Sequence, residues 1–85
     1  MIPIIIPAFE PDERLLSLLD NLNGNGLRPI VVVNDGSNQA YSEIFAQAEK
    51  LLQKGNGVLL VHEANRGKGR ALKTAFEYVR DAYPD

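Results

Sequence analysis

The fold is decided by the stretch Ile30-Val31-Val32-Val33-Asn34-Asp35-Gly36-Ser37. Its first half is an uninterrupted apolar run, too short and too stiff for a helix of ordinary length. Such a run is typical of a strand buried on both faces inside a parallel sheet. The run stops at Asn34–Ser37, where every residue favours a turn, and this places the Asp35 carboxylate at the C-terminal end of the strand. In open α/β sheets, ligands bind at that edge.

Length and composition limit the chain to one small globular domain or a piece of a larger one. It has 85 residues, of which 45% are hydrophobic and 24% charged, as in ordinary globular proteins. The net charge of −2 argues against a nucleic-acid partner, which needs a basic patch. Because there is no cysteine, disulfides and cysteine-ligated metals are excluded. No apolar run approaches the roughly 18–20 residues that span a bilayer, so we expect a soluble, cytoplasmic chain.

Hydrophobic periodicity predicts strands and helices that alternate along the chain. The predicted strands are Ile4–Ile6, bracketed by Pro3 and Pro7, then Pro29–Asn34 and Val58–His62. The first helix is predicted at about Pro11 to Asn23, with leucines 15, 16, 18, 19 and 22 on its apolar face. The second begins near Ala40 with the stripe Tyr41, Ile44, Phe45, Ala48, Leu51 and Leu52, and the third carries Leu72, Ala75, Phe76 and Val79 on one face. Right-handed crossovers then predict a parallel three-stranded sheet with helices on its faces.

The three loops that follow the strands all lie at the C-terminal edge of this sheet. They are Pro7–Glu10, Asn34–Ser37 and Asn65–Gly69, and together they supply two acids, two basic residues and exposed backbone N–H groups around one crevice. An acid at a strand end commonly accepts hydrogen bonds from a ribose or a base. A glycine-rich turn that enters a helix presents the helix N-terminus to anionic groups. The combination indicates nucleotide binding.

Each of these residues also has a purely structural interpretation. Asp35 before Gly36 can serve only to shape a turn. The turn Asn65–Gly69 can be a helix entry with solvated charges, and Glu10, which precedes a proline, can be an exposed loop acid. His62 is the single histidine, and we interpret it as solvent-facing or hydrogen-bonded at its strand end rather than catalytic.

The fingerprints of the common nucleotide-dependent enzymes are missing. No Gly-x-Gly-x-x-Gly follows a strand, and no Gly-x-x-x-x-Gly-Lys-Ser/Thr occurs. One histidine offers neither a zinc cluster nor a nucleophile relay. Dehydrogenase and P-loop enzyme interpretations are therefore weakened.

The three loops, taken in order with their strands, resemble the N-terminal half of the catalytic domain of family-two glycosyltransferases. The matching segments are IIIPAFE (4–10), VVVNDGS (31–37) and NRGKGRAL (65–72), and the likeness covers nearly the whole chain. It looks most similar to the branch related to dolichyl-phosphate mannose synthase and bacterial polyprenyl-phosphate sugar transferases. The resemblance implies an α/β fold: the three-layer, parallel β-α-β-α-β-α half of the GT-A fold, a Rossmann-like nucleotide-diphospho-sugar transferase fold.

The resemblance also implies a binding site for the nucleoside part of a nucleotide-sugar donor. The residues implied to bind the donor are Pro7, Ala8, Glu10, Asp35, Asn65, Gly67 and Lys68. Among them Asp35 is implied to hydrogen-bond the base, and Gly67 with Lys68 to close the pocket. The sequence departs from the family pattern at Glu10, where many relatives have Asn-Glu in place of Glu-Pro, and at Asn34, where Asp is more usual.

The rest of the enzyme is implied to lie in sequence beyond Asp85. In the family an Asp-x-Asp motif on the strand after the third helix binds a divalent metal, Mg or Mn, and the sugar diphosphate. We therefore expect residues 1–85 to be the donor-binding portion of the domain, without catalytic or metal-binding residues of their own and without sugar-transfer activity. The branch implies a polyprenyl phosphate as acceptor, and membrane association at the cytoplasmic face only through downstream sequence.

Sheet order in the family implies one further property. It runs third-second-first and then fourth, so without the fourth strand Ile4–Ile6 becomes an open apolar edge, for which we expect self-association. Two other functions remain as alternatives. One is a non-catalytic α/β nucleotide-binding or regulatory module. The other is a nucleotidyltransferase, which usually carries glycine and arginine after its first strand, whereas Pro7–Glu10 contains neither.

Overall fold

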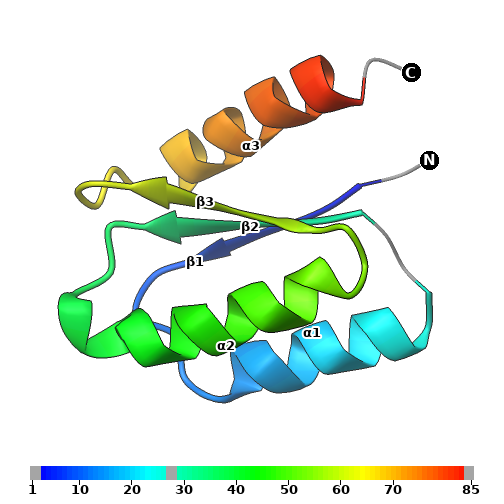
Figure 1. Ribbon diagram of the computed structural model, residues 1–85. Helices are drawn as coiled ribbons and strands as arrows, with labels where there is room; N and C mark the ends of the chain where they lie inside the picture. Colours follow the sequence, from blue (N-terminus) through cyan, green and yellow to red (C-terminus); the bar gives the residue numbers. More distant parts are fainter. Residues whose placement is uncertain (1–2, 27–28, 84–85) are drawn as a thin grey trace.

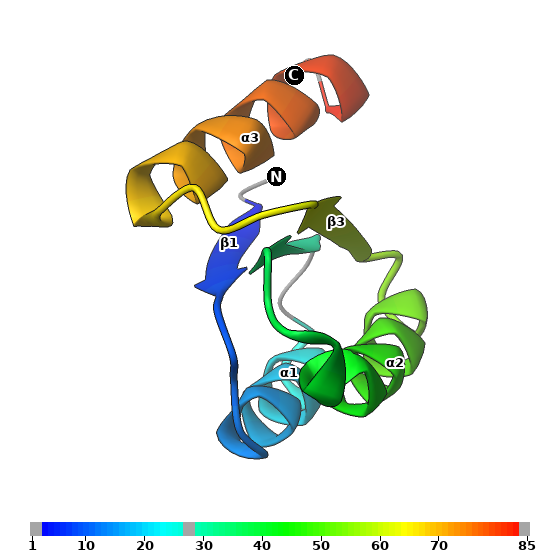
Figure 2. The ribbon, with the colours of Figure 1, turned by 90° about the vertical axis from the view of Figure 1, so that its left-hand side faces the viewer.

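The computed structural model describes residues 3–26 and 29–83, and it has the predicted β-α-β-α-β-α order. The strands are β1 (Ile4–Ala8), β2 (Ile30–Asp35) and β3 (Val58–His62). The helices are α1 (Arg14–Gly24), the short 3-10 helix η1 (Gln39–Tyr41), α2 (Ser42–Gln53) and α3 (Lys68–Ala82). The strands and helices form three layers: the sheet lies in the middle, α1 and α2 cover one of its faces, and α3 covers the other (Figures 1 and 2).

The apolar run that opens β2 forms the centre of the sheet. All strands are parallel in the order β1-β2-β3, and Val32 lies opposite Ile6 on one side and Leu59 on the other. Side chains of a strand alternate between its two faces. Ile30 and Val32 accordingly pack in the core under α1 and α2, and Val31 and Val33 pack under α3. The prediction of a strand buried on both faces is confirmed.

Strand β1 is longer than predicted because it continues through Pro7 to Ala8. Pro7 was expected to end the strand, but it lies opposite Val33 inside the ladder. In the described part of the chain β1 pairs only with β2, and a proline is tolerated on such an edge strand. The open edge is present as expected, and self-association through it stays a prediction.

Helix α1 begins at Arg14, later than the predicted Pro11. The Asp12 carboxylate accepts a hydrogen bond from the backbone N–H of Arg14 at 2.9 Å and pairs with its guanidinium at 2.8 Å. The side-chain hydrogen bond from Arg14, and after it the backbone one, lower the pKa of Asp12 to about 2. Pro11 and Asp12 thus belong to the turn that enters the helix, because the carboxylate supplies the acceptor that a helical backbone would otherwise provide.

The predicted apolar faces of α1 and α2 lie in the core, with one exception. Leu15 and Leu19 of α1 are buried, and so are Phe45 and Leu52 of α2. Leu18 is the exception, because 44% of its surface is exposed. It lies at the margin of the stripe rather than at its centre.

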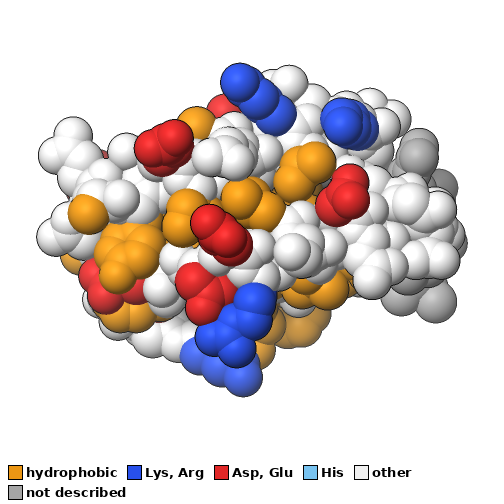
Figure 3. Space-filling model, turned by 90° about the horizontal axis from the view of Figure 1, so that it is seen from below, with side chains coloured by type: hydrophobic (Ala, Val, Ile, Leu, Met, Phe, Trp, Pro, Cys, Tyr) orange, Lys and Arg blue, Asp and Glu red, His pale blue; other side chains and the backbone are white. Residues whose placement is uncertain are grey.

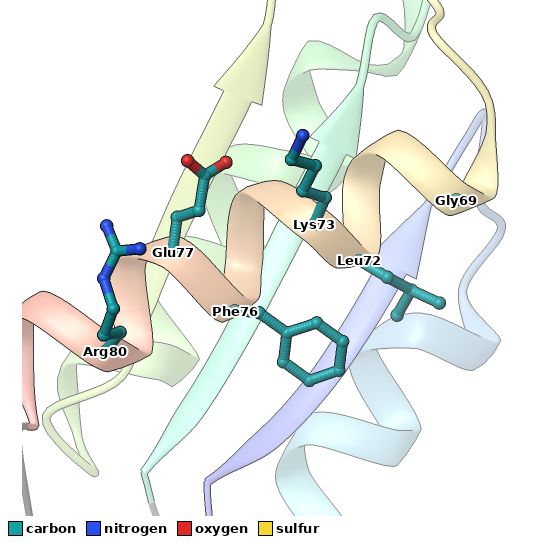
Figure 4. Close-up of a pocket in the computed structure, with 6 residues that line it drawn as sticks. All are labelled: Gly69, Leu72, Lys73, Phe76, Glu77 and Arg80. Atoms are coloured by element: carbon teal, nitrogen blue, oxygen red, sulfur yellow. The ribbon is translucent and has the colours of Figure 1, made fainter.

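The apolar face predicted for α3 is wrong at Phe76, whose exposed fraction is 60%. The buried residues of α3 are Ala71 and Ala75, with Tyr78 and Val79 packed beside them. Figure 4 shows Phe76 projecting from α3 on the same side as Leu72. Each residue turns a helix by about 100°, so a stripe centred on the two alanines leaves Phe76 at its edge.

The two phenylalanines provide a matched test of this packing. Phe45→Ala is expected to lower the free energy of unfolding by roughly 3–5 kcal/mol, because it empties a buried site. Phe76→Ala is expected to change it by no more than about 0.5 kcal/mol, since the ring is largely in water already. Urea denaturation followed by circular dichroism measures both values. Equal losses in the two variants would contradict this placement of α3.

The outer face of α1 and α2 carries no single sign of charge in the part that Figure 3 shows. Acidic and basic side chains are interspersed there with apolar ones (Figure 3). None of the helices within residues 3–26 and 29–83 has the length and apolar character needed to cross a membrane.

Candidate functional site

An open crevice of about 730 Å³ lies at the C-terminal ends of β1 and β2, beside the start of α3. Figure 2 turns this edge of the sheet toward the viewer. The residues that line it, called here the site crevice, are Ile5, Pro7, Ala8, Phe9, Asp35, Asn65, Gly67, Lys68 and Leu72. They come from three separate stretches of sequence, which meet because parallel strands end at the same edge.

The structure brings together all the predicted donor-binding residues except Glu10. Glu10 is exposed and does not belong to the lining of the site crevice. Its backbone has a positive φ of 48°, and its N–H donates a hydrogen bond to the Ser37 hydroxyl at 2.9 Å. Glu10 therefore ties the loop after β1 to the loop after β2 through its backbone. A contact between its carboxylate and a ligand stays a prediction.

Asp35 is the buried charged residue of the site crevice, with 3% of its surface exposed. Its Oδ1 accepts hydrogen bonds from His62 Nδ1 at 2.8 Å and from the backbone N–H of Arg66 at 3.0 Å. The bond from His62 lowers the pKa of Asp35, burial raises it, and the Arg66 N–H lowers it further; the net direction is down. Both of these bonds meet Oδ1, and the backbone of Gly67 also lowers the pKa of Asp35.

His62 joins Asp35 to α3. A carboxylate only accepts hydrogen bonds, so Nδ1 of the imidazole carries the proton that lies between them. Nε2 lies 2.8 Å from the Thr74 hydroxyl, which donates to it when the ring is neutral. The hydrogen-bonded interpretation of His62 is confirmed. The register of the sheet explains the contact, because Asp35 and His62 are directly opposite each other at the ends of their strands.

The turn after β2 uses its other residues for shape. Asn34 Oδ1 accepts a hydrogen bond from the backbone N–H of Ser37 at 3.0 Å. Gly36 has a φ of +73°, and a Cβ there would lie 2.2 Å from backbone atoms of Ala64 and Asn65. The two interpretations of this motif are thus divided among its residues, since Asn34 and Gly36 make the turn while Asp35 faces the site crevice.

The start of α3 provides the positive part of the site crevice. Gly67, with a φ of +89°, precedes Lys68, the first residue of the helix. The first N–H groups of a helix have no partners within it and attract negative charge. Of the two basic residues expected here, only Lys68 lines the site crevice; Arg66 lines a separate hollow with Arg70. The prediction that Arg66 lies at the same crevice was wrong, because successive residues of this turn face different sides.

Ile5, Phe9 and Leu72 line the site crevice but were not predicted to do so. Phe9 is 51% exposed in the structure, and the sequence signal that could have been used is its place in the loop after the first predicted strand, at the C-terminal edge of the sheet. Ile5 and Leu72 carried no such signal, because each belongs to an apolar stripe that also reads as core. Thr74 was missed for a different reason, because a polar residue on a helix surface is usually solvated.

A metal site does not form from the residues in ranges 3–26 and 29–83, which contain no group of three or more His, Cys, Asp or Glu side chains arranged to hold an ion. The metal implied by the resemblance was expected at an Asp-x-Asp motif, which this chain lacks. The divalent metal therefore stays a prediction.

Comparison with known proteins connects this arrangement to a family. The family model described as glycosyl transferase family 2 matches residues 4–83, which include all three loops of the site. An uncharacterized protein of Methanocaldococcus jannaschii, MJ1222, is 37% identical over 75 residues. These cover 87% of this chain but 28% of that protein, so the chain spans less than a third of the relative it matches. No solved structure matches.

Proposed function

Because this chain belongs to glycosyl transferase family 2, we propose that it binds the nucleoside diphosphate part of a nucleotide-sugar donor. The observation that carries the proposal is the pairing, in one crevice, of a buried hydrogen-bond acceptor with the N-terminus of a helix. Asp35 provides the acceptor, and Lys68 begins the helix. A nucleoside diphosphate offers N–H and O–H donors at one end and negative charge at the other.

The walls between these two groups suit the flat ring of a base. Pro7, Phe9 and Leu72 provide apolar surface, and the half-exposed ring of Phe9 is free to stack. Asp35 Oδ2 accepts from a base or ribose, while Lys68 and the first N–H groups of α3 attract the diphosphate. Bond breaking between the sugar and the diphosphate, the metal that stabilises the leaving group and a polyprenyl phosphate acceptor are proposed for the whole enzyme, outside the residues described.

Direct binding tests the proposal. We would titrate the isotopically labelled 85-residue chain with UDP, GDP, CDP and ADP and follow the backbone amides by NMR. At least one nucleotide is expected to shift the amides of Phe9, Asn65 and Lys68. Glu43 and Gln47 line a separate hollow between α1 and α2, so their amides serve as the internal control and should not shift. If none of the four nucleotides shifts the site amides at millimolar concentration, the proposal is wrong.

Two lysines of α3 separate specific binding from general attraction by positive charge. Lys68→Ala is expected to weaken nucleotide binding roughly tenfold, because a charge-assisted hydrogen bond to phosphate is lost. Lys73→Ala removes the same charge from a side chain that lines a different hollow, outside the site crevice. Figure 4 shows Lys73 projecting from α3. Lys73→Ala is expected to leave the affinity within about twofold of wild type. Isothermal titration calorimetry gives both constants, and an equal loss in both variants would contradict a phosphate contact at Lys68.

A further inference from the structure

A chain of hydrogen bonds runs from the wall of the site crevice into the layer between the sheet and α3. It joins Asp35 on β2, His62 on β3 and Thr74 on α3 through two contacts of 2.8 Å. The side chains of Asp35 and His62 are only 5% and 10% exposed. Neither His62 nor Thr74 lines the site crevice. Two polar side chains are thus held behind a third, Asp35, which lines the site crevice.

We infer that His62 and Thr74 are positioning residues, which hold the Asp35 carboxylate in one orientation, as a hydrogen-bond acceptor, for recognition of the nucleoside. This inference rests on the proposed function for its ligand, but its geometry belongs to the protein alone. His62 and Thr74 are not catalytic residues, because they do not reach the site crevice.

The direction of each hydrogen bond explains how the orientation is maintained. Oδ1 of the Asp35 carboxylate can only accept, so Nδ1 of His62 carries the proton that lies between them, and Nε2 is an acceptor when the ring is neutral. The hydroxyl of Thr74 donates to that acceptor and helps to hold the plane of the imidazole ring, while the carboxylate, which has no proton to donate, opposes the other tautomer. A second donor, the N–H of Arg66, meets the same Oδ1 at 3.0 Å. Rotation of the carboxylate would break both bonds to Oδ1, so Oδ2 stays directed away from them.

The same chain of bonds controls whether the carboxyl group accepts or donates. Burial alone favours a protonated Asp35, which would donate a hydrogen bond and repel an N–H donor of the ligand. The His62 contact is the largest effect in the opposite direction, followed by the backbone of Arg66. The side chains that line the site crevice from β1, Ile5, Pro7 and Ala8, carry no charge. From the other elements, Lys68 shares the crevice with Asp35, and Glu63, Arg66 and Arg70 share the hollow beside His62.

Thr74 allows the mildest test, because Thr74→Val removes the hydroxyl and keeps the shape of the side chain. His62→Leu would leave a buried carboxylate without its main partner and is expected to unfold the chain, so it is not used. Thr74→Ser keeps the hydroxyl and serves as the rescue variant. The first measurement is the pH titration of the Asp35 carboxyl carbon by NMR, which needs no ligand. The second is the dissociation constant, as a function of pH, of whichever of UDP, GDP, CDP and ADP binds most tightly.

In Thr74→Val we expect a higher Asp35 pKa than in wild type. The affinity at pH 7 is expected to fall roughly two- to tenfold, as for one lost hydrogen bond, and its loss in acid is expected to begin at a higher pH. Thr74→Ser is expected to restore both properties. An Asp35 titration that is identical in wild type and Thr74→Val overturns the inference, whether or not a nucleotide binds. An altered titration without any nucleotide binding overturns the proposed function, and with it the ligand role of these residues, while the hydrogen-bond chain itself stands.

Discussion

Gly36→Ala is expected to lower the free energy of unfolding by roughly 3 kcal/mol or more, the upper end of what single substitutions cost. Two effects add at this position. The backbone has a φ of +73°, which alanine adopts only with strain, and the new Cβ would lie 2.2 Å from backbone atoms of Ala64 and Asn65. The loops after β2 and β3 would have to separate, so the site crevice would also lose its shape. Urea denaturation and the NMR nucleotide titration measure the two consequences.

Two other glycines separate strain from steric overlap. Gly26 has a φ of +69°, and no residue that the structure describes lies close to the position of an added Cβ, so Gly26→Ala is expected to cost about 1–2 kcal/mol from backbone strain alone. Gly24 has neither problem and lies at the end of α1, so Gly24→Ala is expected to be neutral or stabilising by up to about 1 kcal/mol. A loss at Gly36 no larger than that at Gly26 would show that the two loops do not touch as described.

Asp35→Asn is expected to weaken nucleotide binding at least roughly tenfold, because the amide replaces one acceptor oxygen by a donor and the remaining oxygen is needed by His62 and Arg66. Stability is expected to fall by about 2 kcal/mol at pH 7, since two hydrogen bonds lose their charged partner. The control is Asp20→Asn on the exposed surface of α1, for which neither property should change. Calorimetry and urea denaturation measure the two effects.

The cost of Asp35→Asn should depend on pH in one direction only. The pKa of Asp35 in the folded chain lies below its ordinary value of 3.8. The unfolded chain therefore takes up a proton first as the pH falls, and the stabilising contribution of the carboxylate is lost as the pH falls through the folded-state pKa. The difference in unfolding free energy between wild type and Asp35→Asn should shrink as the pH falls below the ordinary pKa of the Asp35 carboxyl. A difference that grows as the pH falls through that range would contradict the hydrogen-bonded carboxylate.

Much of the fold was predictable because local patterns carry it. The apolar run of β2 identified a strand buried on both faces, and the stripe centred on Phe45 identified the buried face of α2. The position of the site crevice also followed from sequence, since parallel strands place their following loops at one edge. The prediction for the start of α1 was wrong because the side chain of Asp12 supplies a hydrogen bond that composition does not reveal.

The sequence alone therefore determined the order of the elements, the central place of β2 and the edge where Asp35 would lie, because these depend on periodicity and turn chemistry within a few residues. Only the tertiary structure decided what Asp35 contacts. His62 is distant in sequence and reaches Asp35 through the register of the sheet, and Thr74 reaches His62 because α3 packs on that face. The tertiary structure also decided that Phe76 is exposed, because the packing of neighbouring elements determines which part of an apolar stripe is covered. The stretch Ile30–Ser37 specified a carboxylate at the C-terminal edge of the sheet, and packing between layers gave that carboxylate its hydrogen-bond donors, His62 and the backbone of Arg66.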